Sequence, residues 1–173
     1  SISIKEVLKD DSIRINARAY KHTHGSNAPK TITKLKKGWK SELLGELVKE
    51  VFYPGRFKRN YTEYYDGAVP FLGGSNITSN IWKTDKWLRH DDPKLDQLAV
   101  KEGWILVTRS GTTGIVSIVP KEWDGFAMSE HVIRIVPNDK IVSRHYIYSY
   151  LLTPNCQKQI SSEVFGSVID EIS

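Results

Sequence analysis

Cysteine and long apolar runs are almost absent from this sequence. The 173 residues include one cysteine, Cys156, which excludes an internal disulfide and any zinc site built from cysteine pairs. No apolar run is long enough to cross a bilayer, and residues 1–10 alternate charged and apolar side chains, unlike a signal peptide. We therefore expect a soluble protein of a reducing cytoplasm.

The sequence also lacks the strings that mark common catalytic sites. It has no P-loop, no glycine-rich cofactor loop with an Asn/Asp-Pro-Pro-aromatic motif, and no Gly-x-Ser-x-Gly elbow. The remaining candidate ligands and acids lie in polar loops or proline-marked turns, where such residues are common for backbone reasons. They are His22 and His24, Asp91 and Asp92 beside Lys94, and Asp139 beside Lys140. We expect no catalytic residue, no metal site and no cofactor.

Positive charge is concentrated at the start of the chain. The net charge is +5, and residues 1–60 carry 14 lysines and arginines against 6 acids, whereas residues 61–173 carry 11 against 14. A basic first third favours contact with a polyanion such as DNA. Charge alone fits equally well a solvated lysine face on an ordinary enzyme.

Hydrophobic periodicity predicts strands in the middle of the chain and helices towards both ends. Apolar residues recur at helical spacing from Trp39 to Val51, before Pro54-Gly55. The expected strands are Ala68–Leu72, a hairpin of Trp104–Thr108 with Ile115–Val119, and Val132–Val136. The expected closing helices are Ser143–Leu152 and Pro154–Ser162. This order predicts an α+β domain with a central, twisted, mixed but mostly antiparallel sheet and helices near both ends.

Three segments have the composition of a nucleic-acid contact. The polar stretch Gly73–Asn80 carries hydrogen-bond donors and acceptors suited to groove edges, although a plain turn or a helix cap explains it as well. The stretch Trp82–Arg89 interleaves aromatic and cationic residues, as does Arg56–Tyr61. Core packing of Trp82 and Trp87 is the simpler interpretation of those two rings.

Several motifs occur in an order that resembles one known family. They are Leu43-Leu44-Gly45-Glu46-Leu47, then Ala68-Val69-Pro70-Phe71-Leu72 before a polar loop, then Gly103-Trp104-Ile105-Leu106 running into Arg109-Ser110-Gly111-Thr112-Thr113-Gly114, and last the Tyr- and Leu-rich segment 146–152 with Gly166. This order resembles the target recognition domain of type I restriction-modification specificity subunits and of related fused restriction enzymes. The resemblance covers residues 38–173, and residues 1–37 form a lead-in segment outside the common pattern.

The resemblance implies a non-catalytic domain that reads one half of a split site in double-stranded DNA. It implies methyltransferase subunits as partners, which bring S-adenosylmethionine, and a translocase or restriction subunit. Subunits of the family carry two such domains separated by spacer helices, so the chain is expected to be a fragment or a half-subunit. The alternatives are the specificity portion of a fused restriction-methylation enzyme, an unrecognised nuclease, or a protein-interaction module.

Candidate DNA contacts fall into three groups. The basic loop is expected to neutralise phosphates, and Arg109 to contact a phosphate or a guanine edge, unless it forms an internal ion pair that fixes the hairpin. The polar and lysine-rich segments supply the rest. The full set is Arg56, Lys58, Arg59, Ser75, Asn76, Thr78, Asn80, Lys83, Lys86, Arg109, Thr112 and Thr113.

Overall fold

The first sheet joins strands that lie far apart in the sequence. The computed structural model describes residues 37–38, 40–79, 83–162, 164–165 and 171–172. Four antiparallel strands lie side by side in this sheet, in the order β1 (Val48–Phe52), β8 (Val132–Pro137), β5 (Ile105–Thr108) and β6 (Val116–Ile118). In this register, Leu106 of β5 lies opposite Ser117 on one side and Arg134 on the other.

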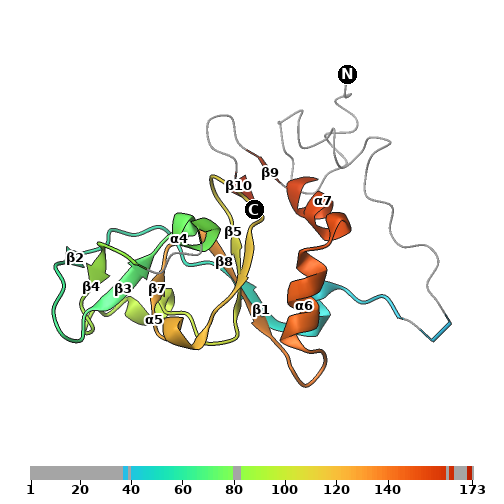
Figure 1. The fold of residues 1–173 in the computed structure, drawn as a ribbon, viewed down its shortest axis with the longest axis horizontal. Coiled ribbons are helices and arrows are strands. Elements are labelled where there is room, and N and C mark those ends of the chain that lie inside the picture. Colours follow the sequence, from blue (N-terminus) through green and yellow to red (C-terminus); the bar gives the residue numbers. More distant parts are fainter. Residues whose placement is uncertain (1–36, 39, 80–82, 163, 166–170, 173) are drawn as a thin grey trace.

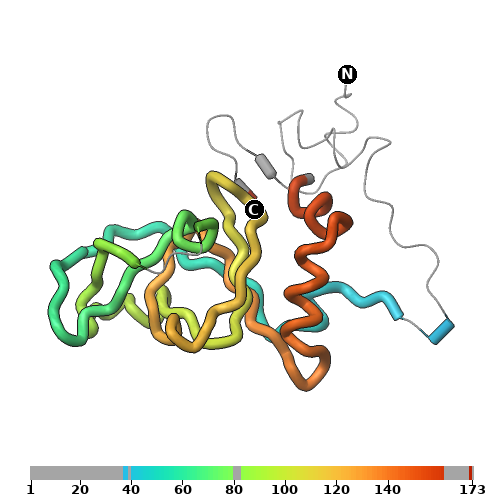
Figure 2. Tube along the Cα trace, viewed as in Figure 1, coloured from blue at the N-terminus to red at the C-terminus, as the bar shows by residue number. Residues whose placement is uncertain are grey.

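A second, smaller sheet lies at the opposite end of the molecule from the C-terminal helices (Figure 1). Its order is β2 (Tyr61–Thr62), β4 (Trp87–Leu88), β3 (Val69–Leu72) and β7 (Ala127–Met128), and only β3 and β7 run parallel. Figure 2 shows that the green part of the chain builds most of this sheet. The red part, which contains the C-terminal helices, lies at the opposite end of the molecule. A short ladder pairs β9 (Val164–Phe165) with β10 (Glu171–Ile172).

Two helices cover one face of the first sheet (Figure 1). Helix α6 (Arg144–Leu151) begins at Ser143, whose side chain accepts a hydrogen bond from the backbone N–H of His145, and α7 (Pro154–Ser162) begins at a proline. The two helices and the first sheet enclose a hydrophobic core. Its buried residues are Val48, Ile105, Val107, Val116, Ile135, Ile147, Leu151 and Cys156.

The other face of β5 packs into a second core. Ile105 and Val107 point to the helices, whereas Leu106 points away from them into the second core. Thr108 is buried as well, so no residue of β5 is exposed. This second core includes Leu72, Ile77 of α4 (Gly74–Ser79) and Trp123 of the 3-10 turn η1 (Lys121–Trp123). A third cluster, formed by Phe71, Leu88, Leu98 of α5 (Leu95–Leu98) and Ala127, supports the second sheet.

The predicted α+β class is confirmed, and so are most of its elements. The hairpin, the strand before Pro137 and both closing helices lie within a residue or two of their expected bounds. The strands divide between two sheets instead of forming a single central one. The lead-in 1–36, with His22 and His24, lies outside the described residues.

The helix predicted for Trp39–Val51 is wrong over most of its length. Only α3 (Leu44–Leu47) is helical, and residues from Val48 onward form β1, which pairs with β8 so that Val51 lies opposite Ile135. The β-branched Val48 and Val51 suit a strand as well as a helix, and pairing with β8 decides between the two. Trp39 lies outside the described residues.

Candidate DNA-binding site

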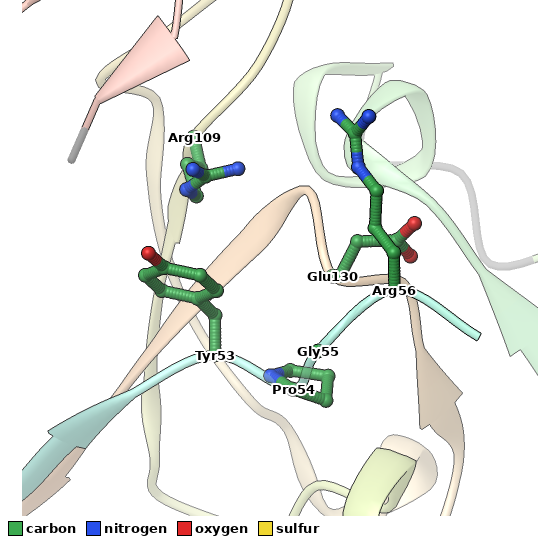
Figure 3. Close-up of a pocket in the computed structure, with 6 residues that line it drawn as sticks. All are labelled: Tyr53, Pro54, Gly55, Arg56, Arg109 and Glu130. Carbon is green, nitrogen blue, oxygen red and sulfur yellow. The ribbon is translucent and has the colours of Figure 1, made fainter.

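Three chain segments converge around one open pocket (Figure 3). The turn after β1 supplies Tyr53, Pro54, Gly55 and Arg56, the end of β5 supplies Arg109, and the connection between β7 and β8 supplies Glu130. These segments meet because β8 lies between β1 and β5 in the first sheet, while β7 belongs to the second. The pocket therefore lies where the two sheets join.

Arg109 is held against an aromatic ring at one side of this pocket. Its guanidinium carbon lies 4.3 Å from the centre of the Tyr53 ring, and Figure 3 shows the two groups stacked one above the other. The Arg109 backbone N–H donates to His131 O at 2.7 Å, and its carbonyl accepts from the N–H of Ile172 at 2.9 Å. Cation–π attraction and these backbone bonds fix where the guanidinium can point.

Glu130 is the acidic group of the pocket, and its charge is matched by Arg59. The two side chains form an ion pair in which each is 10% exposed. Arg59 also donates to Phe57 O at 3.1 Å, and its guanidinium carbon lies 4.9 Å from the Phe57 ring centre and 5.5 Å from that of Phe71. Arg59 was predicted to neutralise a phosphate, but in the structure it is an internal partner of Glu130.

A buried arginine holds the segment that carries Glu130. Arg134 has no exposed surface, and its guanidinium donates to the carbonyls of Met128 and Val132 at 2.8 Å, Leu98 at 3.1 Å and Ser129 at 3.4 Å. Burial lowers the pKa of Arg134 to about 10, and the nearby Glu130 charge opposes that shift. The guanidinium therefore stays charged at neutral pH.

The other two cations of the basic loop, Arg56 and Lys58, have exposed side chains. Arg56 lines the pocket across from Arg109 (Figure 3), and Lys58 lies two residues further along the same loop. The structure thus brings Arg56 and Arg109 together, as a shared phosphate or base contact requires. Their proximity follows from sheet order, which the sequence alone does not reveal.

The polar stretch after β3 is a helix, not a loop. The Asn76 side-chain oxygen accepts from the Gly73 backbone N–H at 2.9 Å, which caps the start of α4, and its amide nitrogen donates to Lys83 O at 3.1 Å. Thr78 bonds back to the carbonyl of Gly74 at 3.0 Å, while Ser75 is exposed. Of the interpretations that the sequence left open here, the helix cap is the one that the structure shows, and buried Ile77 packs α4 into the second core.

The remaining candidates lie on either side of the pocket. Thr112 and Thr113 form the tip of the β5–β6 hairpin, where the Thr108 hydroxyl donates to Thr112 O at 2.5 Å. Lys83 and Lys86 are exposed before β4, and the Lys86 ammonium lies 5.8 Å from the ring centre of Tyr61. Asn80 and Trp82 lie outside the described residues, while Trp87 is half-buried with its ring edge-on to Tyr64 at 4.9 Å.

The acids that a nuclease would need are engaged in local turns. Asp91 accepts from Arg89 at 2.7 and 2.8 Å, Asp92 accepts from the Lys94 backbone N–H at 2.8 Å, and Asp139 bonds to Arg144. Across the part of the chain that the structure describes, no group of three or more His, Cys, Asp or Glu could hold a metal ion. Over the same residues, none of the helices has the length and apolar character of a membrane span.

The fold and the site define an α+β binding domain with an open, mainly basic pocket between two sheets. Residues 36–173 match the family model described as the type I restriction modification DNA specificity domain. The chain therefore belongs to that family, whose members supply specificity and not catalysis.

Solved structures agree with this fold. An HsdS subunit from Thermoanaerobacter tengcongensis is 16% identical with a TM-score of 0.58, over 83% of this chain and 35% of that one. A chain from a study of assembly and conformational transition of the type I R-M system is 18% identical with a TM-score of 0.56, over 75% and 32%. The chain thus spans about a third of the length of these relatives. No curated protein sequence matches it.

Proposed function

We propose that this chain recognises a short sequence in double-stranded DNA and reads one half of a split target for a type I restriction-modification complex. The observation that carries the proposal is the match of residues 36–173 to a DNA specificity domain. The basic pocket supports it, because two guanidiniums, those of Arg56 and Arg109, converge at one surface site. Guanidinium groups suit both phosphate oxygens and base edges.

The proposed contacts surround this pocket. Arg56 and Lys58 neutralise phosphates, Arg109 donates to a phosphate or a base, and the side chains on the hairpin tip and α4 reach the neighbouring backbone or groove. Arg59 and Asn76 are left out, because Glu130 and the α4 cap engage their side chains. The further contacts in this proposal are Ser75, Thr78, Lys83, Lys86, Thr112 and Thr113.

The partners follow from the same proposal. The domain acts in the cytoplasm beside methyltransferase subunits, which bind S-adenosylmethionine, and a translocase or restriction subunit. Catalysis belongs to those partners. As a single module the domain buries roughly 600–1,000 Å² on DNA, so its isolated affinity is modest and falls steeply with salt. Sub-nanomolar binding by the isolated domain at physiological salt would contradict the half-site assignment.

Binding in a chelator and incubation in magnesium separate the candidate functions. Labelled duplexes of about three helical turns are titrated with the protein in EDTA and then incubated with it in Mg²⁺. We expect salt-dependent binding in EDTA and intact DNA in Mg²⁺. Magnesium-dependent cleavage would identify a nuclease, and the absence of any salt-dependent affinity for DNA would identify a protein-interaction module.

A further inference from the structure

The pocket carries a group that a pure phosphate site would not contain. Glu130 lines it together with Arg56 and Arg109, so one acidic side chain and two basic side chains line the same pocket (Figure 3). A carboxylate repels a phosphate and weakens its binding at short range. A nucleobase edge has no such conflict, because it offers neutral donors and acceptors side by side.

Glu130 is placed to serve as an acceptor. Arg59 contacts both of its carboxylate oxygens, with Nη2 on Oε2 and Nη1 3.4 Å from Oε1, and thereby compensates the charge of this 8% exposed residue. His131 Nε2 lies 3.8 Å from the same Oε1. A carboxylate has about four lone-pair positions, so it can accept further hydrogen bonds beside those from Arg59. Arg134 fixes the carbonyls of Met128 and Val132 on both sides of this residue.

Tyr53 gives the neighbouring guanidinium a defined plane. The guanidinium carbon of Arg109 lies 4.3 Å from the centre of the Tyr53 ring, and a guanidinium stacked on a ring leaves its N–H groups free to donate at its edge. A guanidinium held in this way can donate two parallel hydrogen bonds, the pattern that matches guanine O6 and N7. Tyr53 itself is 42% exposed at the rim and was not among the residues predicted from the sequence.

We propose that this pocket reads the major-groove edge of one G·C base pair. Arg109 donates to O6 and N7 of the guanine, Glu130 accepts from the N4 amino group of the paired cytosine, and Tyr53 is a positioning residue that orients Arg109. The inference rests on the proposed function, because it names the base pair that part of the same site reads.

The test compares the motifs that variants select from a random duplex pool, with the slope of log affinity against log salt measured for each. The motif selected by the wild type is expected to contain one invariant G·C pair. Tyr53→Leu should lower the preference for G·C at this position at least tenfold, whereas Tyr53→Phe, which keeps the ring, should retain that preference. Glu130→Gln removes the carboxylate that accepts from cytosine N4 and is expected to weaken the preference for this G·C pair. The salt slope stays unchanged in all three variants, because no phosphate contact is lost.

A phosphate-contact variant serves as the matched control, and the melting temperature of each variant shows whether it is folded. Lys58→Ala, on the exposed loop, lowers the salt slope by about one and leaves the motif intact. Glu130→Gln breaks the ion pair with Arg59 and can therefore lower the melting temperature. Tyr53 is exposed, so Tyr53→Leu tests the base-reading pocket without such a loss of stability. An unchanged motif in Tyr53→Leu, or a lower slope with the same motif, overturns the base-reading pocket. A wild type that selects no motif overturns the proposed function instead.

Discussion

Replacing Arg134 by methionine tests how the segment behind the pocket is held. Methionine keeps most of the volume but removes three hydrogen bonds of 2.8 to 3.1 Å and one of 3.4 Å. Hydrogen bonds to a charged group contribute about 1.5–3 kcal/mol each, and the desolvation of the guanidinium offsets part of that sum. Because the carbonyls that it bonds lose their donor, we expect a net loss of about 3–5 kcal/mol in unfolding free energy.

The assay is urea and thermal unfolding beside a control that loses the same charge. For a domain of this size the loss corresponds to a fall of roughly 10 °C in melting temperature. Arg89→Met is the control, because its ion pair with Asp91 has side chains 63% and 51% exposed, and we expect no measurable change there. A loss for Arg134→Met below about 1 kcal/mol would refute the reasoning, since water would then replace the guanidinium.

Three further predictions concern the hairpin, acid sensitivity and the thiol. Gly114→Ala should cost about 1–2 kcal/mol in urea unfolding, because φ is +83° and the added carbon would lie 3.3 Å from both Gln157 and Ile160; an unchanged midpoint would contradict this. Hydrogen bonds from Arg144 lower the pKa of Asp139 below its ordinary value of 3.8. The pair therefore stabilises the fold above pH 3.8, and this contribution is lost as the pH falls through the lowered pKa. Asp139→Asn should remove this part of the pH dependence of the unfolding free energy. Burial raises the pKa of Cys156, so iodoacetamide should label the native protein far more slowly than the urea-unfolded chain.

Local patterns in the sequence predict the parts of this fold that depend on neighbouring residues. The hairpin of β5 and β6 carries its own turn, with Gly111 and Gly114 at φ near +80°, and both closing helices carry their own start signals. The region Trp39–Val51 was mispredicted, because its conformation is decided by β8, which comes much later in the chain.

The site residues also divide into those that local motifs predict and those that depend on distant parts of the chain. Arg56 and Arg109 were predicted from basic and glycine-rich motifs, and the structure brings them to one pocket. Tyr53 and Glu130 were not predicted, because their places in the pocket depend on contacts with Arg109 and Arg59 across the fold. One signal for a buried network was present: Arg134 interrupts the apolar run Val-Ile-Arg-Ile-Val, a position where a charge must find internal partners.

The central claim is that this domain distinguishes one DNA sequence from another. Its most direct test is the affinity for a duplex carrying the selected motif, compared with a scrambled duplex of equal length and composition, over a range of salt concentrations. Both affinities should fall with salt, and the selected duplex should bind at least a hundredfold more tightly, since each mismatched pair costs about 1–3 kcal/mol. Equal affinity for the two duplexes at every salt concentration would contradict the claim.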